Sequence, residues 1–148
     1  MVSRIVRLTL VVVWLAACSS APVVQAPVDV PAGDPLLGSP SESLWRQAVV
    51  AREQGELAAA GRLLERAVTL VPDSSWLYRE LAELRLREDQ PRAAEGLARK
   101  ALRFAPPTGA YRAALWQLVA TACARSDDPD CVALARREAR VAQKGARQ

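Results

Sequence analysis

The feature that most constrains the fold is an internal repeat in the middle of the chain. Residues 41–72 align with residues 75–106, and the matched positions lie 34 residues apart. The matched pairs are Leu44 with Tyr78, Ala48 with Ala82, Ala60 with Ala94, Ala67 with Ala101, and Pro72 with Pro106. A period of this length indicates that each unit is one supersecondary element, which buries its apolar face by stacking on a neighbour.

Within each unit the pattern predicts two amphipathic helices joined by a short turn. Gly55 and Asp89 fall at the matching turn, and Pro91 suits the first turn of a helix. The repeated alanines are expected where two helices cross, because a methyl group lets helix axes approach to the short end of the ~8–10 Å range. The apolar residues that recur at helical spacing are Leu57, Leu63, Leu64, Ala67 and Leu70, then Leu77, Leu81 and Leu84, then Leu97, Ala101 and Phe104.

This combination of a 34-residue period, paired helices, small residues at the crossings and a closing proline resembles the tetratricopeptide repeat. The resemblance covers residues 41–106 and predicts an all-α fold, a short helical-hairpin solenoid of two such repeats. The match departs from the family at Ala51 and Arg85, where an aromatic residue is usual, and at Gln47, which replaces a large aliphatic residue.

Residues 107–148 are expected to cover the open end of this stack, because about three stacked units are usually needed for stability. Trp116 occupies the position of Ala48 and Ala82, so we expect this last pair to close less tightly, as a degenerate third repeat or a capping hairpin with a basic tail. The pattern of a fifth helix is carried by Tyr111, Leu115, Leu118, Val119 and Ala122, and that of a sixth by Val132, Leu134, Ala135, Val141 and Ala142.

Residues 18–40 read as a disordered spacer. Their prolines, Pro22, Pro27, Pro31, Pro35 and Pro40, block helices and sheet ladders alike. A proline-rich segment of this kind is a semi-rigid tether that extends by ~3.1 Å per residue. The folded part is therefore predicted to begin near Ser41.

Residues 1–17 have the form of a secretory signal. Arg4 and Arg7 precede an apolar run at residues 8–17, which is about half of the ~20 residues that a membrane-spanning helix needs. The sequence LAAC at residues 15–18 resembles the lipobox of bacterial lipoproteins. The resemblance implies a diacylglycerol on Cys18, removal of residues 1–17 and acylation of the freed amine; the alternative is an ordinary signal with a chance cysteine.

Two or more acyl chains anchor a protein stably to a membrane. Ser19, and not an aspartate, follows Cys18. In the sorting pattern of double-membrane bacteria this favours the outer membrane, with the protein facing the periplasm, over the inner membrane.

Charge argues against a nucleic-acid partner. Without Arg4 and Arg7, 18 of the 20 basic residues remain against 16 acidic ones, and this small excess is no nucleic-acid footprint. The excess lies near the end of the chain, where Arg136, Arg137, Arg140, Lys144 and Arg147 face only Glu138. These residues either form a solvated terminal helix or contact anionic lipid or cell-wall polymer.

Cys123 and Cys131 flank a polar turn, CARSDDPDC. Export would place them in an oxidising compartment, where an even pair is expected to form a disulfide; two free thiols are the alternative. Closing so short a loop contributes ~2–3 kcal/mol. The chain has no histidine and its third cysteine is assigned to lipid, so we expect neither a metal site nor a cofactor.

No catalytic residue is predicted. There is no histidine for acid-base chemistry, no nucleophile in a recognisable motif and no glycine-rich phosphate loop. The carboxylates of Glu80 and Glu83 form a conceivable hydrolytic pair, but a solvated helix face explains them more simply. We expect a protein that is not an enzyme and has no small-molecule substrate.

Four serines are explained by helix starts, where a hydroxyl can accept a hydrogen bond from a free backbone N–H. They are Ser41, Ser43, Ser74 and Ser75.

The family resemblance also suggests a binding surface. In tetratricopeptide repeat proteins the first helix of each repeat lines a concave groove that receives an extended or helical peptide. Tryptophan and arginine dominate the energy of many interfaces, although Trp45 and Trp76 are equally explained as half-buried packing residues. The residues placed on this groove are Trp45, Val49, Arg52 and Glu53 from the first repeat, and Trp76, Arg79, Glu83 and Arg87 from the second.

Two function classes follow. The first is a membrane-anchored interaction module that recruits or positions a protein partner during assembly in the bacterial cell envelope. The second is a non-catalytic structural spacer whose basic end contacts anionic cell-wall polymer or lipid.

Overall fold

The computed structural model describes residues 30–145 of the chain. Four predicted features lie outside the described residues: the signal at residues 1–17, the predicted lipid site Cys18, the first part of the spacer, and Arg147 of the basic tail.

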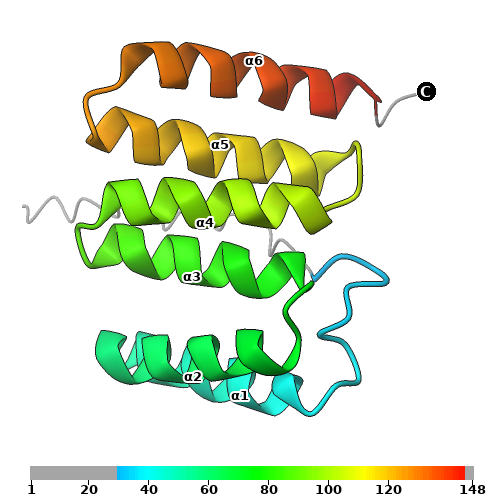
Figure 1. Cartoon of the computed structure of the whole chain (residues 1–148), viewed down its shortest axis with the longest axis vertical. Coiled ribbons are helices and arrows are strands. Elements are labelled where there is room, and N and C mark those ends of the chain that lie inside the picture. The colour runs from blue at the N-terminus through cyan, green and yellow to red at the C-terminus, as the bar shows by residue number, and fades with distance from the viewer. Residues whose placement is uncertain (1–29, 146–148) are drawn as a thin grey trace, which may run out of the picture.

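The described residues form six α-helices and no strand. Consecutive helices pack as antiparallel hairpins, α1 with α2, α3 with α4 and α5 with α6, and the hairpins stack one after another along the long axis of the molecule (Figure 1). The predicted all-α solenoid is confirmed. The helices are α1 (Ser41–Glu53), α2 (Leu57–Leu70), α3 (Ser75–Arg87), α4 (Pro91–Phe104), α5 (Ala110–Arg125) and α6 (Pro129–Gly145).

The turns within the first two hairpins have the same backbone geometry. Gly55 and Asp89, the matched turn residues, both adopt the left-handed conformation, with φ of +80° and +58°. Glycine accepts this region without strain, and aspartate tolerates it better than most residues. Pro91 is the first residue of α4, and the Ser74 hydroxyl caps α3 by accepting a hydrogen bond from the Leu77 N–H.

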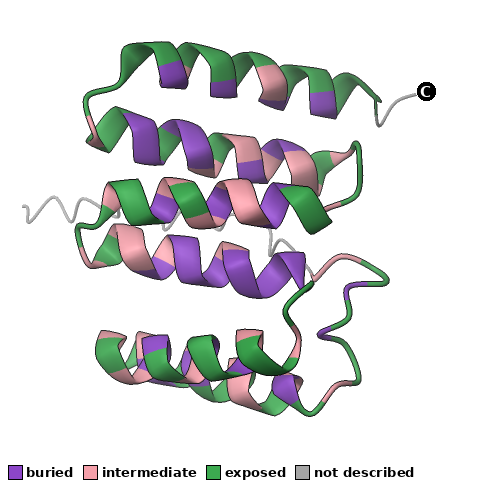
Figure 2. Ribbon diagram, in the orientation of Figure 1, coloured by how far each residue is buried: buried purple, intermediate pink, exposed green. Residues whose placement is uncertain are grey.

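The core divides into two clusters that share the α3 helix. The N-terminal cluster centres on Leu64, Leu77 and Leu84, and the C-terminal cluster on Leu115 and Val119. Figure 2 shows α3 as the most buried helix, in the middle of the stack. The repeated alanines, Ala48, Ala60, Ala67, Ala82, Ala94 and Ala101, are all buried, which is the packing that close helix crossings require.

The third hairpin differs in part from the prediction. Trp116 is only half-buried and packs beside the C-terminal cluster, so it does not hold α6 away from α5. The α6 residues that face α5 are small: Cys131, Ala135, Ala139 and Ala142. Leu134 and Val141, predicted to face the core, are 48% and 57% exposed, because this buried stripe leaves them on the opposite side of the helix.

The folded module also begins before Ser41. Residues 30–40, which we call the strap, follow a series of turns against α1 and α3, and Leu36 is completely buried in the N-terminal cluster. Prolines are compatible with such turns, so the proline content that indicated a disordered spacer does not prevent residues 30–40 from packing.

None of the described helices is both long and apolar enough to cross a bilayer.

Candidate partner-binding face

The predicted groove residues lie together on the first helices of the hairpins, which we call the first-helix face. An aromatic row crosses it from α1 to α3 to α5. The ring centroids of Trp45 and Trp76 are 6.0 Å apart with nearly perpendicular planes, and those of Trp76 and Tyr111 are 5.9 Å apart and stacked. The Arg79 guanidinium lies 4.6 Å from the Trp76 ring centroid, as in a cation-π contact.

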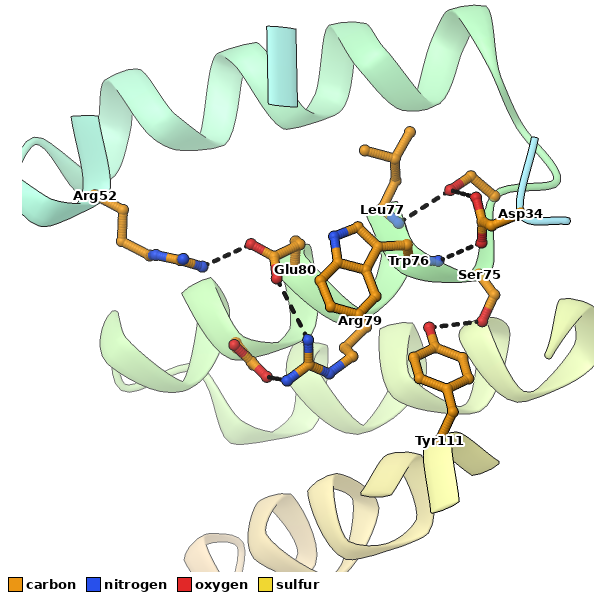
Figure 3. A network of polar contacts seen from close by, with 10 residues as sticks. Asp34, Arg52, Ser75, Trp76, Leu77, Arg79, Glu80 and Tyr111 are labelled. Carbon is orange, nitrogen blue, oxygen red and sulfur yellow. Dashed lines mark hydrogen bonds and ion pairs between the residues drawn. The ribbon is translucent and has the colours of Figure 1, made fainter. Parts of the chain in front are cut away.

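Trp76 is the centre of this row but not a free contact residue. Its side chain lies beside Arg79 and near Tyr111 (Figure 3), and the residue is only 5% exposed. Trp76 is therefore a packing residue: its buried indole contacts Trp45, Arg79 and Tyr111, and leaves almost no surface for a partner. Trp45 is half-buried and keeps part of its surface accessible.

Tyr111 fixes the C-terminal end of the row. Its hydroxyl and the Ser75 hydroxyl share a hydrogen bond of 2.9 Å. Burial raises the pKa of Tyr111 because the phenolate would lose its hydration, although the Ser75 hydrogen bond opposes the shift. The hydroxyl therefore stays protonated and links α3 to α5.

A chain of charges runs beside the aromatic row (Figure 3). Arg52 Nη1 donates to Glu80 Oε2 at 2.7 Å, which joins α1 to α3. Arg79 bridges the other Glu80 oxygen at 3.5 Å and Glu83 Oε1 at 2.6 Å. Burial raises the pKa of Glu83, and the positive charge of Arg79 opposes that shift. Arg52 and Arg79 are thus neutralised and held in place by the carboxylates of Glu80 and Glu83.

The surface available to a partner is the rim of this network. Val49 is half-buried, whereas Glu53 on α1 and Arg87 on α3 are exposed. The structure therefore brings the predicted residues onto one face but gives them different roles. Trp45, Val49 and Arg87 are accessible, Arg52, Arg79 and Glu83 form the ion network, and Trp76 packs beneath it.

Sequence reasoning missed three residues that build this face: Asp34, Glu80 and Tyr111. The buried Asp34 carboxylate fastens the strap to the start of α3 by accepting hydrogen bonds from Trp76 N–H at 3.0 Å and Ser74 Oγ–H at 2.7 Å. Glu80 was assigned with Glu83 to a solvated helix face, but it is buried and bound by Arg52 and Arg79. Its helical spacing puts it on the same side of the helix as Trp76 and Glu83, and this is the signal that could have found it. Asp34 and Tyr111 carry none, since both lie outside the two matched repeats.

The cysteine pair lies between α5 and α6, away from the first-helix face. Cys123 and Cys131 are paired in the structure, with Cα atoms 5.8 Å apart. The Glu95 carboxylate is close enough to form a three-ligand group with the two sulfurs. However, Arg99 already binds Glu95 at 2.8 Å and lies 3.4 Å from the Cys131 sulfur, and a guanidinium there disfavours a metal cation.

Comparison with known proteins agrees with this architecture. The tetratricopeptide repeat profile matches residues 51–118. The structure of the globular C-terminal domain of P. aeruginosa LpoP is similar, with a TM-score of 0.66 and 33% sequence identity. The similarity covers 70% of this chain and 98% of that domain. No curated protein sequence matches the chain.

Proposed function

Because the chain belongs to the tetratricopeptide repeat family, we propose that it is a membrane-anchored interaction module that binds a protein partner in the bacterial cell envelope. The observation that carries the proposal is the continuous row from Trp45 through Trp76 to Tyr111 across three first helices. Such a row holds the face rigid before binding, which lowers the entropy cost of association.

The partner is an extended or helical segment of a protein that places apolar side chains against Trp45 and Val49. Its charged groups meet the exposed Glu53 and Arg87 at the rim. A surface with accessible aromatic and aliphatic groups at the centre and charges at the edge has the usual organisation of a protein interface.

The anchor is the lipid predicted on Cys18, which holds the module at the outer membrane with its helices in the periplasm. The LAAC sequence at residues 15–18, after the basic start and apolar run, supports this part of the proposal. The folded residues follow the anchor as the C-terminal part of the chain, as the compared domain of LpoP is described as C-terminal.

The module is proposed to bind and not to catalyse. The carboxylate pair considered for hydrolysis, Glu80 and Glu83, supports this, because each carboxylate is bound by an arginine. A carboxylate whose oxygens are held by a guanidinium is a poor general base, because the pairing occupies the lone pairs that would have to accept a substrate proton.

A pull-down from envelope extract tests the proposed face. The bait is residues 30–148, which contain both core clusters and so fold without the preceding segment. Two variants alter rim residues that take part in none of the ion pairs of the network: Val49→Glu and Arg87→Glu. Each should reduce capture of the specific partner at least tenfold while circular dichroism stays unchanged, because interface anchors contribute ~2 kcal/mol or more.

The matched controls are Arg66→Glu on α2 and Arg103→Glu on α4, which reverse exposed charges on second helices. They should capture the partner as well as the unaltered module does. Equal loss in the controls, or full capture by both rim variants, would move the partner site off the first-helix face.

A further inference from the structure

The outer face of α6, turned away from α5, concentrates positive charge and exposed aliphatic side chains. In Figure 2 the buried residues of α6 face α5 and the exposed residues cover its outer side. This outer face consists of Leu134, Arg136, Arg137, Arg140, Val141 and Lys144, all exposed.

The charges of α6 differ from those of the rest of the module. Every ion pair found within residues 30–145 joins side chains between Glu42 and Arg125, so the cations of the outer face are left without a carboxylate partner. Glu138, the one acidic residue between Cys131 and Gly145, is half-buried on the side that faces α5. The helix thus separates its charges instead of neutralising them.

We propose that the outer face of α6 docks on the surface of an anionic phospholipid membrane, with the helix lying along the headgroups. Four cations distributed along about two turns match a surface with many dispersed phosphates. Leu134 and Val141 lie on one edge of the same face, where they can enter the boundary between headgroups and acyl chains.

The length of chain before the strap allows this orientation. Residues 19–29 join Cys18 to the start of the described module, and these 11 residues reach at most ~36–40 Å. The strap is fastened to α3, and three interaxial steps of ~8–10 Å separate the axis of α3 from that of α6. With the ~5–6 Å radius of α6 added, a bilayer beneath α6 lies ~29–36 Å from the α3 axis, which the fully extended tether spans.

Docking through α6 would orient the long axis of the solenoid away from the membrane, with α6 at the lipid surface. The first-helix face would then point sideways along the membrane, open to a partner, and α1 and α2 would lie farthest from the lipid (Figure 1). The inference rests on the proposed lipid anchor for proximity, while recognition of the membrane belongs to α6 itself.

Vesicle co-sedimentation of the unlipidated fragment 30–148 tests the proposal without the acyl chains. The fragment should bind vesicles that contain phosphatidylglycerol, bind vesicles of phosphatidylcholine alone far more weakly, and release in high salt. The test variant replaces Arg136, Arg137, Arg140 and Lys144 with glutamine. Each cation near an anionic surface contributes about fivefold to binding, so the variant, which lacks four of them, should lose roughly 600-fold in affinity.

A matched control removes the same number of exposed, unpaired cations from α2 and α4: Arg62, Arg66, Arg92 and Arg103, each to glutamine. It should keep most of the vesicle binding. An equal loss of vesicle binding in the control would show that only net charge matters and would overturn the proposal. The proposal would also be wrong if the unaltered fragment does not bind anionic vesicles, or if it binds only soluble acidic proteins or glycans.

The same α6 variant should still capture the protein partner in the pull-down. Its result there separates failure of the membrane contact from failure of the proposed function.

Discussion

Replacing Asp34 with alanine should unfasten the strap and destabilise the whole N-terminal half of the module. The Asp34 carboxylate accepts three hydrogen bonds: from Leu36 N–H at 3.0 Å, Ser74 Oγ–H at 2.7 Å and Trp76 N–H at 3.0 Å. Trp76 is the second residue of α3, and the Ser74 cap satisfies only the N–H of the third. The strap thus supplies an acceptor that the helix start lacks.

The expected cost follows from these contacts. Without the carboxylate, the buried N–H groups of Leu36 and Trp76 lose their acceptors, at ~1–3 kcal/mol each. Loss of a negative charge at the start of α3 adds ~0.3–1 kcal/mol, while removing a buried charge gives part of the cost back. A net loss of about 3 kcal/mol results, which for a module of this size corresponds to a fall in Tm of about 10–15 °C.

Urea and thermal unfolding of residues 30–148, followed by circular dichroism, measure the effect. Asp73→Ala is the matched control, because Asp73 is an exposed carboxylate just before the same helix and accepts no hydrogen bond found within residues 30–145. A fragment that begins at Ser41, and so lacks the strap, should lose at least as much stability as Asp34→Ala. If Asp34→Ala costs under 1 kcal/mol, or no more than Asp73→Ala, the structural role assigned to the strap is wrong.

Four further predictions test other parts of the molecule. Trp76→Ala should destabilise the module by ~3–5 kcal/mol in urea unfolding, as expected for a buried tryptophan, and unchanged stability would remove Trp76 from the core. Burial raises the pKa of Tyr111 above its ordinary value of 10, so as the pH rises the unfolded chain loses the phenol proton before the folded chain does. The free energy of unfolding should therefore fall above pH 10. The tyrosinate absorbance of Tyr111, identified by its loss in Tyr111→Phe, should appear only when the protein unfolds. Cys18→Ser should yield a protein that partitions into the aqueous phase of a detergent extraction and lacks the mass of the acyl chains. If the unaltered protein and the variant differ in mass only by the substitution itself, the lipoprotein assignment is wrong. Cys123 and Cys131 should resist alkylation until a reductant is added, and two reactive thiols in the exported protein would contradict the disulfide.

How far the fold could be predicted depends on which residues repeat. The alanines at helix crossings recur every 34 residues because two helices can approach closely only where side chains are small, so hairpins and turns followed from the sequence. The strap did not, because Leu36 and Asp34 are single residues among prolines and their partners lie some 40 positions away. Leu134 and Val141 were misplaced because a helical spacing of apolar residues does not tell which stripe faces the neighbour.

The binding face was only half predictable for a similar reason. The alignment placed Trp45, Arg52, Trp76 and Arg79 on one side of the first helices, and the structure brings them together. Whether each side chain is accessible depends on contacts from other helices. Tyr111, which stacks on Trp76, comes from the third hairpin, where the matching positions of the first two repeats, Ser43 and Leu77, are not aromatic.

Photo-crosslinking of the exported protein in living cells is the sharpest test of whether the first-helix face binds a protein partner. A photoreactive amino acid replaces Val49 on the first-helix face or, as a matched position, the exposed Leu70 on α2. We expect one discrete crosslinked envelope protein from position 49, absent when Arg87→Glu is added, and none from position 70. Crosslinks that arise equally from both positions, or only from position 70, would contradict a partner-binding role for the first-helix face.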